Sequence, residues 1–484
     1  MNRMWLAVAC AAFAGISACG SSQPAGSGAE PSGATTTATP KAVCGPGSRP
    51  ETGMQGRVSR AEVDSGRAGQ GYTCNTEMVG SYTTPNAIGT VGGFKVERYV
   101  DAAGHDCAYY DSTLLFPTNI FNTEAGVNVL DMSDPTHPVL VDQLLTPAML
   151  SPHESLVLSK QRGLLAAVLG NPAAYPGDVD VYDVSQDCRH PVLKAWLPVG
   201  VLGHESGMAP DGRTFYSASP GTPTLTAIDI SNPSLPLPLA ITSFYSHGLS
   251  ISDDGNRAYV AGVGYAGADG NKPYPALIIL DVSEIQARAP NATMREISRL
   301  TWDTITVPQN AIPITIQGHP YLVEIDEYST NGSGGNVAVN GKRVGAGRII
   351  DIGDEKNPRV ISDLRLEVHQ PENRAQIAND PGANNPTQGY AGHYCNVPTR
   401  HDPGIVACSM IISGLRVFDI HDPFNPREVA YFNAPVNPRP AIGFFEASNW
   451  AMSSPSFVPE RKEIWYTDGY SGFYAVRVTN GAWR

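Results

Sequence analysis

Short apolar runs that end in an aspartate recur along this chain. The stretch LRVFDIHDPFNPREVAYF begins at Leu415, and closely similar stretches begin at Val127 and Leu225. Near-continuous Ile, Val and Leu are typical of a strand that is buried on both faces. The aspartate can accept hydrogen bonds from N–H groups of the next turn, and the prolines that follow end the strand. The aspartates at this position are Asp131, Asp183, Asp229, Asp281, Asp351 and Asp419.

Each run belongs to a longer unit with four predicted strands. In the clearest unit, which starts at Ser246, we expect strands over His247–Ser252, Arg257–Gly262, Ala276–Val282 and Arg295–Trp302. The Asp-Gly pair between the first two of these strands is a strong hairpin signal. Units of about 40–50 residues with four strands each predict a β-propeller. The predicted fold class is therefore all-β.

The number of blades follows from the count of these units. Six runs end in aspartate, and a seventh run, Phe473–Gly481, has Arg477 in that place. The last unit stops after its third strand, so a closed ring needs one more strand from elsewhere in the chain. The stretch EMVGSYTT, Glu77–Thr84, resembles the missing strand, and we predict that it closes a seven-bladed propeller without an open sheet edge. Eight blades, or a separate N-terminal module, are the alternatives.

The repeat resembles the LVIVD family, whose defining element has the form of VLDMSDPTHPVL at Val129 and VFDIHDPFNPREV at Val417. The resemblance extends from about Gly92 to the end of the chain. It implies a propeller in an exported, often surface-associated protein. The family implies no reaction, so it supplies no catalytic residue for this chain.

The first residues resemble the leader of a bacterial lipoprotein. Arg3 precedes an apolar stretch that is too short to cross a bilayer, which takes about 20 residues. The ending Ile16-Ser17-Ala18-Cys19 resembles a lipobox, which implies that Cys19 is acylated and becomes the first mature residue. An ordinary signal peptide cut nearby is the alternative. We expect a lipoprotein signal peptide at 1–18, a lipid-anchored disordered tether at 19–43, a segment with the closing strand at 44–91 and the propeller at 92–484.

Composition and charge narrow the cellular setting. The formal charge of −13 argues against binding to nucleic acid, which needs a basic surface.

An even number of cysteines outside the leader suggests disulfides in an exported protein, and we expect Cys395 to pair with Cys408. No spacing typical of a cysteine-based zinc site occurs. The six candidates for disulfides are Cys44, Cys74, Cys107, Cys188, Cys395 and Cys408.

Histidines recur near the start of the first strand in several units, where a propeller places side chains beside its central channel. They are His153, His204, His247 and His393, and Asn310 and Asn449 stand at the corresponding positions of two other units. Converging imidazoles would bind a divalent transition metal or an anionic ligand at the channel mouth. The alternative is that these side chains only hydrogen-bond neighbouring blades and channel water. Because side chains alternate along a strand, we expect Glu154 and Glu205 to point away from the channel.

The sequence contains no recognisable catalytic set. It lacks a GxSxG elbow and the Walker and Rossmann glycine patterns. We therefore expect a monomeric cell-envelope lipoprotein, held at the outer membrane or cell surface, whose propeller binds a protein or small-molecule partner. The alternative is a metal-dependent oxidoreductase or hydrolase that uses the channel histidines. Two insertions, Tyr328–Gly347 and His369–Tyr390, are either binding loops or merely flexible.

Overall fold

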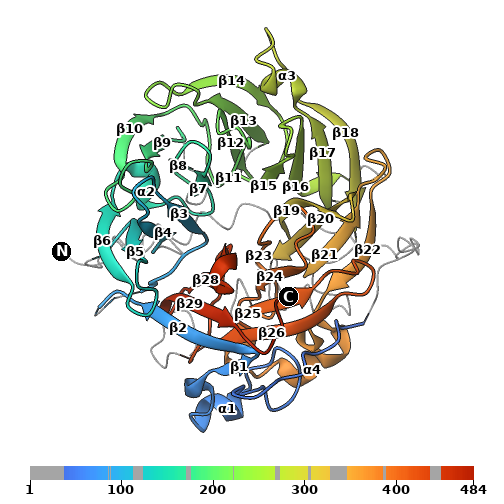
Figure 1. The fold of residues 1–484 in the computed structure, drawn as a ribbon. Coiled ribbons are helices and arrows are strands. Elements are labelled where there is room, and N and C mark those ends of the chain that lie inside the picture. Colours follow the sequence, from blue (N-terminus) through green and yellow to red (C-terminus); the bar gives the residue numbers. More distant parts are fainter. Residues whose placement is uncertain are drawn as a thin grey trace, which may run out of the picture.

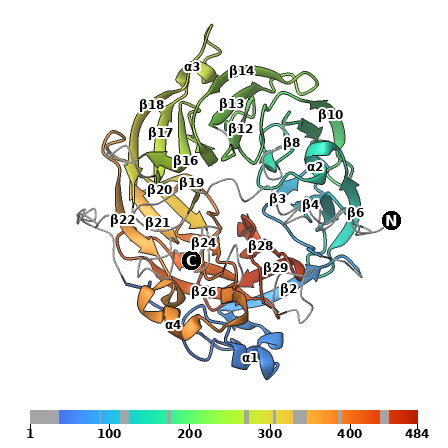
Figure 2. The same ribbon diagram turned by 180° about the vertical axis from the view of Figure 1, so that it is seen from behind.

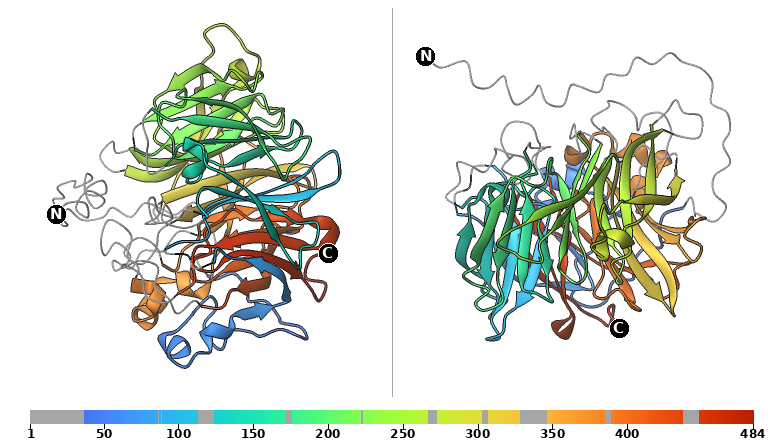
Figure 3. Two further views of the ribbon diagram at one scale, coloured as in Figure 1. Left: turned by 90° about the vertical axis from the view of Figure 1, so that its left-hand side faces the viewer. Right: turned by 90° about the horizontal axis from the view of Figure 1, so that it is seen from above.

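Seven antiparallel sheets surround a central axis and form a closed propeller (Figure 1). The computed structural model describes residues 37–85, 87, 89–112, 124–170, 176–221, 223–266, 273–302, 307–327, 346–384, 389–436 and 448–484. The predicted signal peptide, Cys19 and most of the insertion Tyr328–Gly347 lie outside these residues. Figure 3 shows the blades from the side, with their strands running from one face of the molecule to the other.

The first four blades each use four consecutive strands, as the repeat predicts. Blade 1 has β3 (Val96–Val100), β4 (Asp106–Asp111), β5 (Val127–Asp131) and β6 (Val139–Leu144). Blade 2 has β7 (Val157–Ser159), β8 (Leu164–Val168), β9 (Val179–Asp183) and β10 (Val192–Leu197). Blade 3 has β11 (Glu205–Met208), β12 (Thr214–Ser219), β13 (Thr224–Asp229) and β14 (Leu237–Thr242). Blade 4 has β15 (Ser246–Ile251), β16 (Arg257–Ala266), β17 (Pro273–Asp281) and β18 (Arg295–Thr301).

Blade 5 also has four consecutive strands, β19 (Val307–Ile316), β20 (His319–Glu327), β21 (Gly347–Asp351) and β22 (Arg359–Leu364). The last two blades, in contrast, contain strands from both ends of the chain. Blade 6 has β23 (Tyr394–Asn396), β24 (Ile405–Ser409), β25 (Leu415–Asp419) and β26 (Arg427–Asn433), with β1 (Tyr72–Cys74) as a fifth strand. Blade 7 has β27 (Ser456–Val458), β28 (Glu463–Asp468), β29 (Gly472–Val478) and, from the N-terminal segment, β2 (Thr76–Tyr82).

The pairing of β2 with β29 supplies the strand that the last repeat lacks. The register runs from Thr76 opposite Val478 to Tyr82 opposite Phe473. It lies where the sequence predicts a closing strand over Glu77–Thr84. The edge of β29 is therefore paired, and the propeller has seven blades.

The third strand of each blade is buried on both faces, which explains its apolar sequence. In β5, Val129 packs with residues of blade 2 such as Leu165, while its neighbour Leu130 packs with Trp465 of blade 7. Successive side chains of one strand therefore serve two different interfaces between blades. Both interfaces exclude water, so no polar alternation remains in the run.

In six of the seven blades an aspartate ends this strand and organises the following turn, as predicted. One carboxylate oxygen of Asp131 accepts a hydrogen bond from the N–H of Ser133 at 2.9 Å. The other five aspartates accept the same bond, two residues on, at 2.8–3.0 Å. The repeated Asp is thus a local turn device.

All six cysteines in the described part of the chain form disulfides. Cys395 pairs with Cys408, as predicted, at directly opposite positions of β23 and β24. Cys107 pairs with Cys188, which links blade 1 to blade 2, and Cys44 pairs with Cys74. The sequence alone does not establish these last two pairings.

The helices are short and lie in the N-terminal segment or in the connections between strands. They are α1 (Arg60–Asp64), η1 (Ala68–Gln70), α2 (Pro147–Leu150), α3 (Ser283–Gln286), η3 (Glu367–His369), η4 (Pro371–Asn373), α4 (Arg374–Ile377), η5 (Pro381–Asn384) and η6 (Pro459–Arg461). Within the described residues, none of them has the length and apolar character that a membrane span requires.

The N-terminal segment and the second insertion pack against each other on the outer edge near blade 6. Figures 1 and 2 both show α1 and α4 side by side there. The guanidinium of Arg57 donates to both carboxylate oxygens of Asp380, at 2.8 and 2.9 Å, and the Tyr390 hydroxyl contacts both Asp380 and Val58. The described part of the insertion His369–Tyr390 therefore serves the packing of the N-terminal segment.

Candidate metal centre

The four histidines that the repeat singles out meet at the propeller axis. His247 lies in β15, while His204 and His393 directly precede β11 and β23, and His153 lies a few residues before β7. These strands are the innermost ones of blades 2, 3, 4 and 6, which surround the centre in Figure 1. The Nε2 atoms of His204 and His247 are 2.9 Å apart. All four residues are buried, at no more than 9% exposure.

Two carboxylates lie among the imidazole rings. The Glu154 carboxylate oxygens are 3.2 Å from His247 Nε2, 3.2 Å from His393 Nε2, 3.4 Å from His204 Nε2 and 3.9 Å from His153 Nε2. The Glu327 carboxylate oxygens lie 3.3 Å from His393 Nε2 and 3.6 Å from His247 Nε2. Six side chains from four blades and the turn before β7 therefore share one buried centre, which we call the channel centre: His153, Glu154, His204, His247, Glu327 and His393.

Backbone carbonyls fix the orientation of two of the rings. Nδ1 of His247 lies 2.8 Å from the Pro308 carbonyl oxygen, and Nδ1 of His393 lies 2.6 Å from that of Met452. Since a carbonyl oxygen only accepts hydrogen bonds, Nδ1 carries the proton in both rings. Nε2 of each ring faces the channel centre and can bind a metal once it has released its own proton. This arrangement is common for histidines that bind metal.

The expectation that Glu154 and Glu205 point away from the channel is wrong. His153 has a positive φ of 52°, and the N–H of Ser155 donates to the Pro152 carbonyl, so this segment is a turn. Strand alternation therefore begins only at β7, and the Glu154 side chain joins the histidines. The sequence His-Glu recurs in blade 3 as His204-Glu205, where the glutamate has other partners.

Glu205 lies in the channel but contacts a different set of side chains. Its carboxylate accepts from Lys95 Nζ at 3.2 Å and from Asn310 Nδ2 at 2.8 Å, and it is fully buried. These partners come from blades 1 and 5, on other sides of the axis. A side chain at Gly248 would collide with this carboxylate, at 1.7 Å from Glu205 Oε2. The glycine after His247 therefore leaves room for Glu205.

The asparagines at the equivalent positions differ in their surroundings. Asn310 reaches the channel through Glu205. Asn449 instead donates to the Ala434 carbonyl at 2.8 Å and contacts Asn433. The two aligned positions therefore differ in the structure: Asn310 lies in the channel, and Asn449 makes local packing contacts.

Burial and charge shift the proton affinities of the channel centre in opposite directions. Burial acts to raise the pKa of the Glu154 carboxyl, but His247 and hydrogen bonds from three imidazoles hold it well below its ordinary value. Burial acts to lower the pKa of His247, yet Glu154 and Glu327 raise it to about 10. Burial and the charge of His204 hold the pKa of His153 well below its usual range. The negative charge of Glu154 and the positive charge of His247 therefore stabilise each other.

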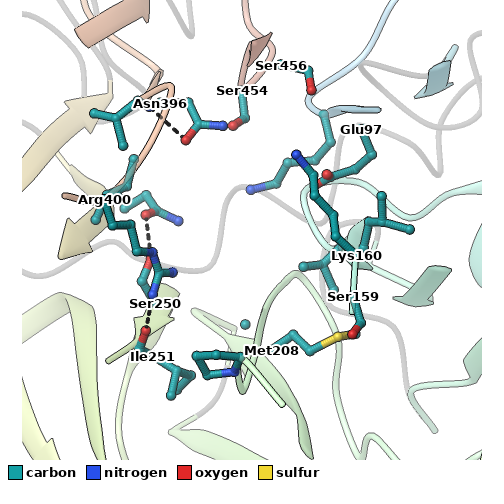
Figure 4. Close-up of a pocket in the computed structure, with 18 of the residues that line it drawn as sticks. Glu97, Ser159, Lys160, Met208, Ser250, Ile251, Asn396, Arg400, Ser454 and Ser456 are labelled. Atoms are coloured by element: carbon teal, nitrogen blue, oxygen red, sulfur yellow. Dashed lines mark hydrogen bonds between the residues drawn. The ribbon is translucent and has the colours of Figure 1, made fainter. Parts of the chain in front are cut away.

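A polar cavity of about 480 Å³ lies further along the channel. Its wall residues follow the histidines on the same inner strands, for example Met208 after His204 and Ile251 after His247. Figure 4 shows Glu97, Lys160, Arg400 and several serines around the hollow. Burial raises the pKa of Glu97 to about 7, although Lys160 and Lys95 oppose this shift. Lys95 and Asn310 line the cavity and also bind Glu205, so they connect it with the layer next to the channel centre.

Sequence reasoning missed Glu327 and Lys95. Glu327 ends β20, the second strand of its blade, where no histidine-bearing repeat position draws attention to it. A signal was present, because Glu324, Asp326 and Glu327 stand close together in a strand that is otherwise buried and apolar. Buried carboxylates need partners, which in such a place are cations or metal.

The family comparison agrees with the repeat. A model described as the LVIVD repeat matches residues 122–146 and 222–239, each of which spans the Asp turn of a blade. Two segments of the chain therefore match the LVIVD repeat. No curated protein matches this chain.

Comparison with solved structures finds distant similarities. The chain is similar to hydrazine synthase of Kuenenia stuttgartiensis, with 12% identity, a TM-score of 0.49 and coverage of 83% of this chain and 98% of that one. It is similar to a 6-phosphogluconolactonase-like protein of Bacteroides fragilis, with 10% identity, a TM-score of 0.48 and coverage of 80% and 89%. For a periplasmic gluconolactonase of Pseudomonas aeruginosa the values are 13%, 0.45, 74% and 98%. At these values the similarities carry no argument about function.

Proposed function

We propose that this LVIVD-repeat propeller is a metal-dependent enzyme whose channel centre binds a transition metal. The observation that carries this proposal is the spacing of the donor atoms. Two ligands bound about 2.1 Å from one ion lie about 3.0–3.4 Å apart for angles between 90° and 109°. The closest contacts of the channel centre measure 2.9, 3.2, 3.2, 3.3 and 3.4 Å.

The donor set indicates which ions fit. Imidazole nitrogens suit zinc, copper, iron and nickel, and the carboxylates of Glu154 and Glu327 add the negative charge that a divalent cation needs. A redox-inactive ion such as zinc would support hydrolysis through Lewis-acid activation, while copper or iron would support an oxidation. The identity of the bound metal therefore separates the two reaction classes.

A catalytic role fits this centre better than a structural one. The ring is already closed by β2, and three disulfides crosslink the chain. The fold therefore does not depend on a metal in the way that a small zinc domain does. The polar cavity offers space for a substrate on the channel axis, with Lys95 and Asn310 between it and the channel centre.

Metal analysis tests the first step of this proposal. The purified protein, folded in the presence of Zn, Cu, Fe and Mn, should contain stoichiometric metal, measured by inductively coupled plasma mass spectrometry. A variant with His153, His204 and His247 changed to Ala should lose it. The matched control changes three exposed histidines, His137, His190 and His401, and should retain the metal. Metal-free wild type would overturn the proposal.

A second measurement separates a catalytic from a structural metal. A catalytic site keeps a coordination position open to exogenous ligands, whereas a structural site is closed. Azide added to the cobalt-loaded protein should therefore change the visible absorption spectrum. An unchanged spectrum at saturating azide would contradict catalysis while leaving metal binding in place.

A binding role is the second candidate, and one surface favours it. The outer strands β10 and β14 expose large apolar side chains, among them Trp196 at 53% and Ile241 at 56%. Such a rim suits a protein partner. It is the function we expect if the channel centre takes up no metal.

We also infer that the protein works in the cell envelope, attached through Cys19. Three disulfides support an oxidising compartment outside the cytoplasm. The leader that resembles a lipobox supports the lipid anchor. Mass spectrometry of the mature N-terminus tests this, and an unacylated terminus other than Cys19 would contradict it.

A further inference from the structure

The two carboxylates of the channel centre are shared between two pairs of histidines. Oε1 of Glu154 is the oxygen near His153 and His393, at 3.9 and 3.2 Å. Its other oxygen, Oε2, is the one near His204 and His247, at 3.4 and 3.2 Å. Each oxygen of Glu154 therefore faces two histidines, although the rings of His153 and His204 also lie together, with centroids 4.3 Å apart.

Glu327 repeats this division from a different side of the axis. Its Oε1 lies 3.6 Å from His247 Nε2, and its Oε2 lies 3.3 Å from His393 Nε2. Glu154 comes from the turn before β7, in blade 2, and Glu327 from the end of β20, in blade 5. Both carboxylates thus span the same two positions, with one oxygen at each.

A single ion held by all four histidines does not fit this arrangement. Such an ion would have to lie about 2.1 Å from each Nε2. The Glu154 carboxylate contacts all four Nε2 atoms and so fills the space between them. Each histidine pair, in contrast, can share an ion with the carboxylate oxygen that faces it.

We propose that the channel centre takes two divalent transition-metal ions, bridged by the carboxylates of Glu154 and Glu327. His204 and His247 bind the first ion, and His153 and His393 bind the second. Each ion then has two nitrogen and two oxygen ligands. This inference rests on the proposed function, and it changes the class of site from a mononuclear to a carboxylate-bridged dinuclear one, in which ions are typically about 3.5–4 Å apart.

The two ions should bind with different affinities. His204 and His247 have their Nε2 atoms only 2.9 Å apart and close to Glu154, so their position is already assembled. His153 Nε2 lies 3.9 Å from its carboxylate oxygen, so the second position must contract. The second ion also meets the charge of the first. We expect the second dissociation constant to exceed the first by at least about tenfold.

Titration of the metal-free full-length protein with Mn²⁺ and with Co²⁺ tests the stoichiometry. The stoichiometry from isothermal titration calorimetry and the metal content from elemental analysis should both be two ions per chain. The electron paramagnetic resonance spectrum of the Mn²⁺-loaded protein should show exchange coupling, which requires two neighbouring ions. The variant Glu327→Gln removes one bridging charge and should bind one ion, with the coupling lost.

The outcomes separate this inference from the proposed function. No bound ion overturns both. One ion in the wild type, lost in the triple histidine variant, overturns the dinuclear centre and leaves the metal site. Two uncoupled ions also overturn it, because the second then lies elsewhere, for example at the group of Asp101, His105 and Asp187. The control Asp187→Asn removes that group and should leave two coupled ions. If Glu327→Gln does not fold, the coupling in the wild type still decides.

Discussion

The aspartate that ends the third strand and the histidine that begins the first are both repeated, but their copies have different neighbours. Each aspartate accepts the N–H two residues further along its own turn, as Asp131 and Asp281 do at 2.9 and 3.0 Å. The histidines contact residues of other blades. His204 of blade 3 and His247 of blade 4 approach each other to 2.9 Å.

Radial geometry accounts for this difference. Positions on the third strand are separated from their copies by whole sheets, so each copy keeps the same local role. Positions at the start of the first strand face the axis, where all copies meet. A residue that the repeat copies for structural reasons can therefore become one member of a cluster, and the cluster has chemistry that no single copy has.

The largest expected effect comes from neutralising the glutamate of one His-Glu pair, Glu154, and comparing the result with the same change in the other pair, at Glu205. Glu154→Gln should weaken metal binding by more than about 100-fold, because it removes a charged ligand that faces all four imidazoles. Glu205→Gln should change the affinity by less than about tenfold, since Glu205 binds Lys95 and Asn310 instead. Chelator competition with the cobalt-loaded protein measures both. Equal losses in the two variants would show that charge alone, and not ligation, sets the affinity.

The local contacts of the repeat were open to prediction, whereas the channel centre was predictable only in part. Patterns within one unit set the strands, the Asp turns and the seven blades, and the position of His247 at the start of β15 followed from them. The role of Glu154 did not follow, because the turn at His153 interrupts strand alternation. Glu327 comes from a second strand of another blade, and no spacing along the chain relates it to the histidines. Contacts across the axis depend on side-chain reach, which a repeat pattern does not encode.

A smaller effect is expected from breaking one copy of the Asp turn. Asp131→Ala should lower the free energy of unfolding by about 1 kcal/mol, the net contribution of one hydrogen bond, because the N–H of Ser133 can bind water instead. Metal content should stay unchanged, since Asp131 contacts Ser133 and Arg189 and not the channel centre. Chemical denaturation and elemental analysis measure the two quantities. Asp131→Asn, which keeps an acceptor oxygen, is the matched control and should lie closer to the wild type. Loss of metal in Asp131→Ala would contradict the separation of the two positions.

The smallest effect is the acid sensitivity of a single Asp turn. Hydrogen bonds from the Ser283 hydroxyl and N–H lower the pKa of Asp281 from 3.8 to about 2. A carboxyl with a lowered pKa in the folded state stabilises the fold above pH 3.8, and this contribution is lost as the pH falls toward 2. Since the side chain is partly solvated, the loss should stay below about 1 kcal/mol.

Comparison with Asp281→Asn isolates this contribution. The asparagine keeps an acceptor for the Ser283 N–H but carries no charge at any pH. The difference in unfolding free energy between wild type and variant should be constant above about pH 5 and should shrink as the pH falls toward 2, because the unfolded wild-type chain takes up a proton at Asp281 before the folded protein does. Urea denaturation across this range measures it. A constant difference down to pH 2 would mean that the turn uses the shape of the side chain and not its charge, so that even the uniform copies of the repeat would act by geometry alone.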